Sequence, residues 1–169
     1  MTTLTLLQSK MVEFLTDQGI SALAAWPKED RQVRKEPLAV VKVKEVEATA
    51  AGFQHYLGEA FDDTSQRWIE TYGQKVKVRF ALELYSPVSE GEEGCRRLLD
   101  QVAVALQKVG PEGLSVDSWT MGETAFQRES GMFHGRLQVV CRGLLTAETD
   151  TDGVFQGFEV KGEVQVWLQ

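Results

Sequence analysis

One segment, residues 75–109, constrains the fold most strongly, because its hydrophobic period changes from that of a strand to that of a helix. Apolar residues occupy alternate positions from Val76 to Leu84, and charged residues hold most of the positions between them. This spacing puts the apolar side chains on one face of a β-strand and the charged ones on the other. From Cys95 to Val109, apolar residues recur every three or four positions, as along one face of an α-helix. The segment therefore predicts a half-exposed sheet that a helix over 94–109 covers on one side.

Residues 1–19 predict another amphipathic helix. Thr2 or Thr3 is a suitable N-cap, and Gly19 is a natural residue for the left-handed position that ends a helix. The expected apolar stripe consists of Leu4, Leu7, Met11, Phe14 and Leu15. Residues 20–26 have no clear period, and the charged stretch 28–36 indicates an exposed loop.

Residues 38–86 predict strands with a protruding β-hairpin at 52–72. Aromatic and branched residues fill both arms of this hairpin, and Asp62-Asp63-Thr64-Ser65 between them is good turn chemistry. Gly73-Gln74 is expected to turn the chain into the next strand. The strands expected in this part are 38–47, 52–57, 67–72 and 75–85.

The remaining residues, 114–169, predict only strands and turns. Bends are expected at Gly122, at Ser130-Gly131 and at 149–153. The expected strands are 114–121, 124–127, 133–147 and 158–168. We therefore expect residues 1–169 to form a single α+β domain: an antiparallel or mixed β-sheet with two amphipathic helices packed on one face and a protruding β-hairpin.

The composition argues against nucleic-acid binding as the main role. The chain has 169 residues and a net charge of −7, and its Lys and Arg residues are scattered among acids, whereas phosphate binding needs them clustered. The sequence shows no signal peptide and no apolar run of the roughly 18 residues that a membrane helix requires. We expect a soluble protein made in a reducing cytoplasm, with no membrane association.

The residue pattern argues against a catalytic site and against a metal site. Cys95 or Cys141 can be paired with His134 as a nucleophile and base, but both cysteines lie on patterned apolar faces and are expected to be buried structural thiols. No Cys/His cluster has zinc spacing. The stretch from Asp150 to Gly153 lacks the later ligands of a calcium loop and indicates a hairpin turn instead. We expect no catalytic residue, metal or cofactor.

The aromatic residues of the predicted hairpin are the candidate functional residues: Phe53, Tyr56, Trp68 and Tyr72. A two-stranded ribbon is only marginally stable in water, so these side chains need something to pack against. They either fold back on the parent sheet or dock on a neighbouring subunit, where Trp and Tyr are favoured anchors.

Several short motifs also resemble a known family when they are taken in order. Their order along the chain is Tyr56-Leu-Gly58, Tyr72-Gly73, Leu82-Glu-Leu-Tyr-Ser-Pro87, the Cys-bearing helix from Cys95, the Gly122-Glu123 step, the strand from Phe133 and the closing Phe155-Gln-Gly-Phe158. Together they resemble small phage and prophage tail proteins, and most of all the tail terminator (tail completion) proteins of long-tailed phages. The likeness covers residues 50–147 and the closing motif.

This resemblance implies a helix-backed sheet that assembles as a hexameric ring at the head-proximal end of the tail tube. Such a ring would halt tube polymerisation and join the tail to the head, with the tail tube protein and a head-completion or neck protein as partners. DNA would pass through it without specific binding, and the protein would be made in the bacterial host cytoplasm and reside in the virion tail. The hairpin is the candidate for one contact patch, and an exposed sheet edge such as the final strand for the other. The alternatives are another neck, connector or baseplate component and, from a different class, a small cytoplasmic Cys/His enzyme.

Overall fold

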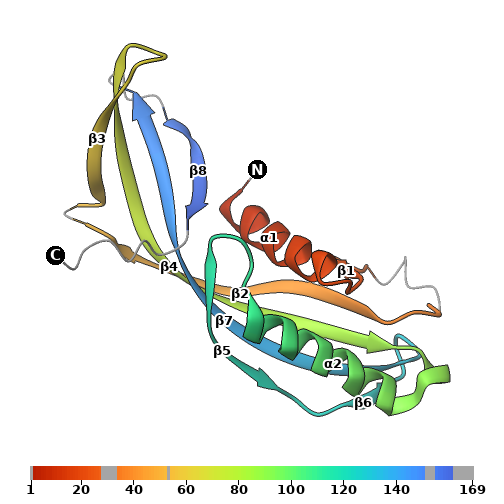
Figure 1. The fold of residues 1–169 in the computed structure, drawn as a ribbon. Coiled ribbons are helices and arrows are strands. Elements are labelled where there is room, and N and C mark those ends of the chain that lie inside the picture. Colours follow the sequence, from red (N-terminus) through yellow and green to blue (C-terminus); the bar gives the residue numbers. More distant parts are fainter. Residues whose placement is uncertain (1, 28–33, 53, 151–154, 162–169) are drawn as a thin grey trace.

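The computed structural model of the protein describes residues 2–27, 34–52, 54–150 and 155–161. It has an α+β fold in which two helices accompany a mixed eight-stranded sheet within the described ranges (Figure 1). The helices are α1 (Thr3–Asp17) and α2 (Gly91–Lys108), the latter preceded by a 3-10 turn at Val88–Glu90. The strands are β1 (Ala22–Leu23), β2 (Leu38–Ala50), β3 (Tyr56–Asp62), β4 (Arg67–Ser86), β5 (Leu114–Met121), β6 (Ala125–Gln127), β7 (Met132–Asp150) and β8 (Phe155–Lys161).

Two long strands, β4 and β7, run through the whole sheet. They pair antiparallel from Ile69 with Asp150 to Ser86 with Phe133, without a register shift. The order through the body is β1-β2-β4-β7-β5, with β6 also on β7. Among the described strands, β1 alone pairs in parallel, with β2. At the other end of the two long strands, β3 pairs with β4 and β8 pairs with β7. We call this four-stranded end, β3 with the paired ends of β4, β7 and β8, the extension (Figure 1).

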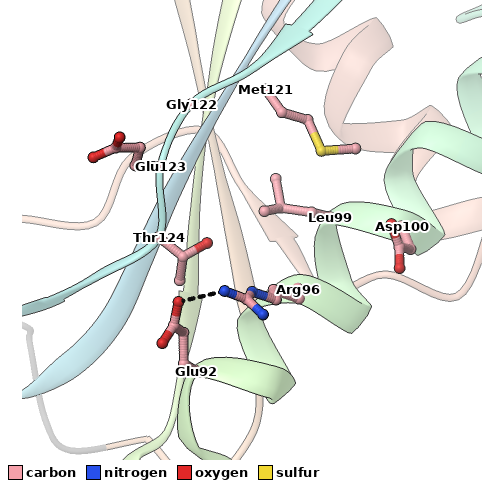
Figure 2. Close-up of a pocket in the computed structure, with 8 residues that line it drawn as sticks. All are labelled: Glu92, Arg96, Leu99, Asp100, Met121, Gly122, Glu123 and Thr124. Carbon is pink, nitrogen blue, oxygen red and sulfur yellow. Dashed lines mark hydrogen bonds and ion pairs between the residues drawn. The ribbon is translucent and has the colours of Figure 1, made fainter.

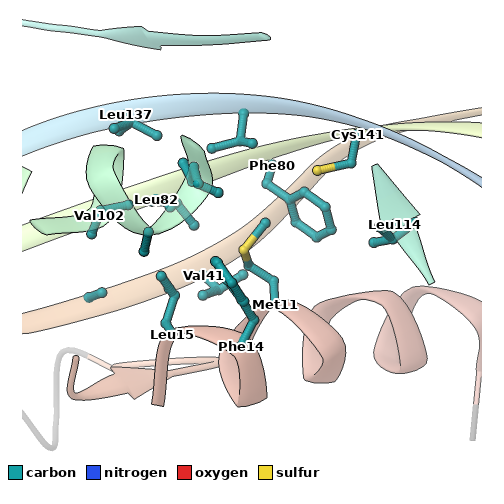
Figure 3. Packing of buried hydrophobic residues seen from close by; sticks show 14 of the residues in the cluster. Met11, Phe14, Leu15, Val41, Phe80, Leu82, Val102, Leu114, Leu137 and Cys141 are labelled. Carbon is teal, nitrogen blue, oxygen red and sulfur yellow. The ribbon is translucent and has the colours of Figure 1, made fainter. Parts of the chain in front are cut away.

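Both helices pack on the same face of the sheet, which we call the inner face. The even-numbered residues Val76 to Leu84 of β4 point to this face and meet the apolar sides of α1 and α2 (Figure 3). The buried cluster includes Leu7, Met11, Leu15, Phe80, Leu82, Leu99, Val102, Leu137 and Cys141. Strand alternation therefore separates a helix-covered inner face from an outer face, as the period of two predicts.

The boundaries of α1 agree with its predicted capping residues, but α2 begins at Gly91, three residues before the predicted start at 94. Glu92 and Glu93 thus lie in its first turn, where the helix dipole favours acids, rather than before the helix. Each predicted apolar stripe is also one residue too long. The side-chain oxygen of Thr2 accepts a hydrogen bond from the backbone N–H of Thr5, and Gly19 has a φ of +78°. Leu4 is 55% exposed and Val109 is 62% exposed, so neither belongs to the core as predicted. Both lie at or beyond a helix end, where the periodicity continues but the sheet no longer lies beneath it.

The predicted turn at Gly73-Gln74 is wrong, because β4 runs straight through it. Gly73 pairs with Thr146, and the side chain of Leu57 lies over it: a Cβ at Gly73 would be 2.5 Å from Cδ1 of Leu57. The glycine thus makes room for a neighbouring side chain within a strand rather than reversing the chain.

Other strand boundaries also differ from the prediction, and β2 continues to Ala50 rather than ending at 47. Strand β3 begins at Tyr56 rather than at 52 and continues to Asp62, which shortens the hairpin turn to residues 63–66. Strand β7 extends over 132–150, and β6 begins at Ala125. The predicted final strand is present as β8, which begins at Phe155, while residues 162–168 of that prediction lie outside the described part.

The outer face has a small apolar cluster of its own at the end opposite the extension. It consists of Trp26, Leu38, Val40, Tyr85 and Met132. The rings of Trp26 and Tyr85 meet edge to face with centroids 4.9 Å apart. The segment after β1, which has no clear sequence period, thus contributes a buried aromatic residue to the outer face. Among the described residues, no helix is long and apolar enough to cross a membrane.

Candidate assembly surface

The inner face of the extension presents two pairs of aromatic residues that lie directly opposite one another on β3 and β4. Tyr56 pairs with Tyr72, and Phe61 pairs with Trp68. The ring centroids of the two pairs are 5.7 Å and 5.6 Å apart, and both pairs meet edge to face. Strand alternation from Val76 back to Trp68 places these rings on the same face of the sheet as the core, beyond the end of the helices.

Most of this aromatic surface is open to solvent. Trp68 is 49% exposed, Phe61 45% and Tyr56 40%, whereas Tyr72 is half-buried. The side chains therefore pack against each other without folding back into the core, which was one of the two alternatives from the sequence. Phe53, the remaining predicted residue, lies outside the described residues. Phe61 was not among the predicted residues. It lies opposite Trp68 because the turn of the hairpin is centred between these two residues.

The turn at the tip of the hairpin is held by Asp62. Its carboxylate accepts backbone hydrogen bonds from Thr64 at 3.2 Å and Ser65 at 3.1 Å. Hydrogen bonds from the Ser65 side chain and from these backbone groups lower the pKa of Asp62. The predicted turn chemistry is thus confirmed, and it fixes the register that brings the aromatic residues opposite each other.

Between the two aromatic pairs lies a pair of acids. Glu59 on β3 is directly opposite Glu70 on β4. The hydroxyl of Tyr72 donates a hydrogen bond of 2.7 Å to Glu70. The pKa of Tyr72 is raised by this hydrogen bond, and that of Tyr56 is raised by partial desolvation and by the charges of both acids. The surface is therefore aromatic and negatively charged at once.

A cleft of about 340 Å³ lies at the base of the extension. Its lining combines polar and apolar residues: Gln54, His55, Tyr72, Gly73, Gln74, Leu145, Ala147 and Thr149. The backbone N–H of Gly73 donates to the carbonyl of His55 at 2.7 Å, and His55 itself has a φ of +68°. The Nδ1 atom of His55 is buried and has no hydrogen-bond partner within the described structure.

A larger cleft of about 570 Å³ lies between α2 and the bend from β5 to β6 (Figure 2). Its lining residues are Glu92, Arg96, Leu99, Asp100, Met121, Gly122, Glu123 and Thr124. Arg96 forms a 2.9 Å ion pair with Glu92, one turn earlier on the helix. The lining thus contains no histidine or cysteine, and its arginine is already paired with a helix neighbour.

The structure does not bring the candidate nucleophiles and base together. Cys95 and Cys141 are fully buried on the inner side, where burial raises the pKa of both thiols, that of Cys141 to about 12. His134 lies on the outer face, where its ring contacts Glu83 and Tyr85. The thickness of the sheet therefore separates each thiol from the imidazole. Within the described ranges, no group of three or more His, Cys, Asp or Glu side chains is arranged to hold a metal ion. Asp152 and Gly153 of the predicted turn at 149–153 lie outside those ranges.

Comparisons with known proteins find similar solved structures. No protein-family model matches the chain, and no curated protein matches it. Among solved structures, the chain is similar to the sheath/tube terminator of an extracellular contractile injection system (PVC) in its extended state. The two share 13% sequence identity with a TM-score of 0.49, and the match covers 97% of this chain and 64% of that one. This chain therefore spans less than two thirds of the length of the protein that it resembles.

Proposed function

We propose that the protein is a non-enzymatic structural subunit, a tail terminator that forms a ring, caps a tail tube and joins it to the head. The observation that carries the proposal is the exposed aromatic surface of the extension. The order of motifs that resembles tail terminator proteins, set out above, supports the same role.

The exposed rings favour assembly because their apolar surface has a lower free energy in a protein interface than in water. A Trp or Tyr that serves as a hot spot of an interface contributes about 2 kcal/mol or more, and such residues are frequent anchors of protein contacts. The extension holds the rings on paired strands rather than on a loop, so little conformational entropy is lost when they dock. This surface is therefore suited to bind another protein subunit.

A ring also needs a second, different patch on each subunit, since head-to-tail contacts use unlike surfaces. The extension projects from one end of the helix-covered body (Figure 1). The outer face of the body, on the side of the sheet away from the helices, is the surface that would receive the extension of a neighbour. The net charge of −7 suits a channel through which DNA slides without sticking. The proposed partners are copies of the same chain, the tail tube and a head-completion or neck protein.

The proposal is tested by measuring the mass of the purified protein by light scattering over a concentration series, alone and with purified tail tubes. We expect a species near six times the 18.9 kDa of the chain, with a central hole in negative-stain images of the same fractions. A protein that remains monomeric alone and does not bind the ends of the tubes contradicts the proposal. Binding along the tube or at its other end would instead favour a baseplate or connector role.

Trp68→Ala should weaken this assembly about 30-fold, the equivalent of 2 kcal/mol, and leave the fold intact. Phe126→Ala is the matched control: Phe126 is 50% exposed and meets Phe133 edge to face with ring centroids 5.6 Å apart, but it lies in β6, away from the extension. Far-UV circular dichroism and thermal melting check that both variants fold. Equal assembly by both variants and the wild type would count against the extension as an interface.

A further inference from the structure

The pair Glu59 and Glu70, which we call the acidic rung, is unfavourable within one subunit. Like charges directly opposite each other on neighbouring strands destabilise a sheet. The described residues give neither carboxylate an ion-pair partner, and the hydroxyl of Tyr72 is the hydrogen-bond donor found at Glu70. An aromatic pair lies on each side of the rung. A cation placed here would meet two carboxylates and the faces or edges of four rings.

A second like-charge pair has the opposite sign. Lys77 on β4 lies directly opposite Arg142 on β7, and both are exposed on the outer face of the body. We call this pair the basic rung. It is flanked along β4 by Lys75 and Arg79, which point to the same face. Arg142 also donates to Asp117 at 2.7 Å and Arg79 pairs with Glu45 at 3.1 Å. Glu47 on β2 lies directly opposite Lys77 on the side away from β7, but neither Lys75 nor Lys77 forms an ion pair among the described residues.

The two surfaces also match in spacing. The three inner-face residues Trp68, Glu70 and Tyr72 follow one another at every second position of β4, as do Lys75, Lys77 and Arg79 on the outer face. Side chains two residues apart on a strand are separated by about 7 Å in both cases. The three cations can therefore face three successive cross-strand pairs of the extension. Lys77 would lie at the acidic rung, and Lys75 and Arg79 would lie over the two aromatic pairs.

From this complementarity, and resting on the ring proposed above, we propose that the acidic rung of one copy of the protein docks on the basic rung of the next copy. The contact joins the inner face of one extension to the outer face of a neighbouring body. Unlike faces give a head-to-tail contact that can repeat around a ring. A two-fold dimer through the extension would instead place four carboxylates together, which disfavours that arrangement.

A zero-length carbodiimide cross-link between a carboxylate and an amine tests the contact directly. Along β4, Glu70 is about 17 Å from Lys75 and about 23 Å from Lys77 within one chain, so such a link can form only between chains. We expect the assembled wild-type protein to give cross-linked peptides that join Glu59 or Glu70 to Lys75 or Lys77, in the oligomer band alone. Cross-linked oligomers from which these peptides are missing would overturn the inference.

Charge reversal provides an independent test by light scattering. Glu59→Lys and Lys77→Glu should each raise the concentration of half-assembly at least tenfold, and the chain that carries both should return to within about threefold of wild type. Asp100→Lys and Lys108→Glu, at exposed positions on α2, are the matched controls and should change assembly less than threefold. Melting curves establish that each variant is folded.

The outcomes separate this inference from the proposed function. If the wild type forms rings but the double variant assembles no better than the weaker single variant, the two rungs do not meet and the ring proposal stands. If the wild type forms no ring, either alone or on tail tubes, the proposed function fails and this inference fails with it.

Discussion

The carboxylate of Glu83 on β4 contacts Nε2 of His134 on β7, and the side chain of Arg136 donates to the other carboxylate oxygen at 3.0 Å. Glu83 is only 3% exposed, although it lies on the outer face of the sheet. The hydrogen bond from His134 and then that from Arg136 lower its pKa from 4.5 to about 2, against the opposing effect of burial. The imidazole of His134 and the guanidinium of Arg136 therefore hold a buried carboxylate in place.

This cluster predicts a pH dependence of stability. A carboxyl group whose pKa is lower in the folded state stabilises the fold above its unfolded pKa and loses that contribution as the pH falls through the folded value. The free energy of unfolding should therefore lose up to about 3 kcal/mol from Glu83 between pH 4.5 and about 2. Urea unfolding of wild type and Glu83→Gln over this range isolates the effect, because the difference between them should shrink as the pH falls. A difference that is constant with pH would contradict it.

At pH 7, Glu83→Gln should itself lower the free energy of unfolding by about 1–3 kcal/mol, since it leaves His134 and Arg136 without their anionic partner. Glu45→Gln is the matched control. It removes the ion pair with Arg79, in which both side chains are largely exposed, and should cost less than about 1 kcal/mol. Equal losses in the two variants would show that burial does not strengthen the Glu83 cluster.

Leu99 tests the packing of α2 on the sheet. Its side chain is 4% exposed in the core, so Leu99→Asp should cost more than about 4 kcal/mol and unfold most of the protein at 25 °C. Val104 lies on the same helix but is 48% exposed, and Val104→Asp should cost less than about 1 kcal/mol. Thermal melting monitored by circular dichroism distinguishes the two. A near-wild-type melt for Leu99→Asp would refute the packing of this helix face.

Gly113 lies where β5 begins beside β8. Its φ is +77°, and a Cβ there would be 2.6 Å from the carbonyl oxygen of Val160, a backbone atom that cannot easily move. Gly113→Ala should therefore cost more than about 2 kcal/mol in urea unfolding. At Gly131 φ is +65°, and the space around it is open, so Gly131→Ala should cost only about 1–2 kcal/mol for the backbone strain. If the two variants are equally stable, β8 does not lie against Gly113.

The two thiols test the enzymatic alternative. Cys95 and Cys141 are buried and their pKa values are raised, so alkylation of the native protein at pH 8 should be at least about 100-fold slower than after unfolding in urea. Ser118→Cys adds an exposed thiol on β5 as a positive control and should react at once. Rapid modification of a native cysteine would favour a Cys/His enzyme over the structural role proposed here.

Local patterns in the sequence were sufficient wherever a residue's environment follows from its own element. The alternation of Val76 to Leu84 predicted the inner face, and the spacing from Cys95 predicted α2, since both periods arise from backbone geometry. At Gly73 the same reasoning failed. The pair Gly73-Gln74 is typical of a turn, but strand partners on both sides keep β4 continuous there.

The candidate surfaces were only partly predictable. Tyr56, Trp68 and Tyr72 stood out because large aromatic residues are few and their hairpin has a clear turn signal. Their pairing with each other, the inclusion of Phe61 and the intervening acidic rung depend on a register that has a shift between Tyr56 and Gly58. The basic rung was not predicted, because Lys77 and Arg142 are distant in sequence and only the register of β4 with β7 makes them neighbours.

The sequence by itself determined the α+β class, the two helices, most of the core and the turn at the tip of the hairpin, because these follow from periodicity and capping within single segments. Only the tertiary structure decided which residues lie opposite each other: Glu83 with His134 and Arg136, Glu59 with Glu70, and Lys77 with Arg142. The physical reason is that strand register depends on long-range pairing, and a shift of one residue would move every side chain to the other face.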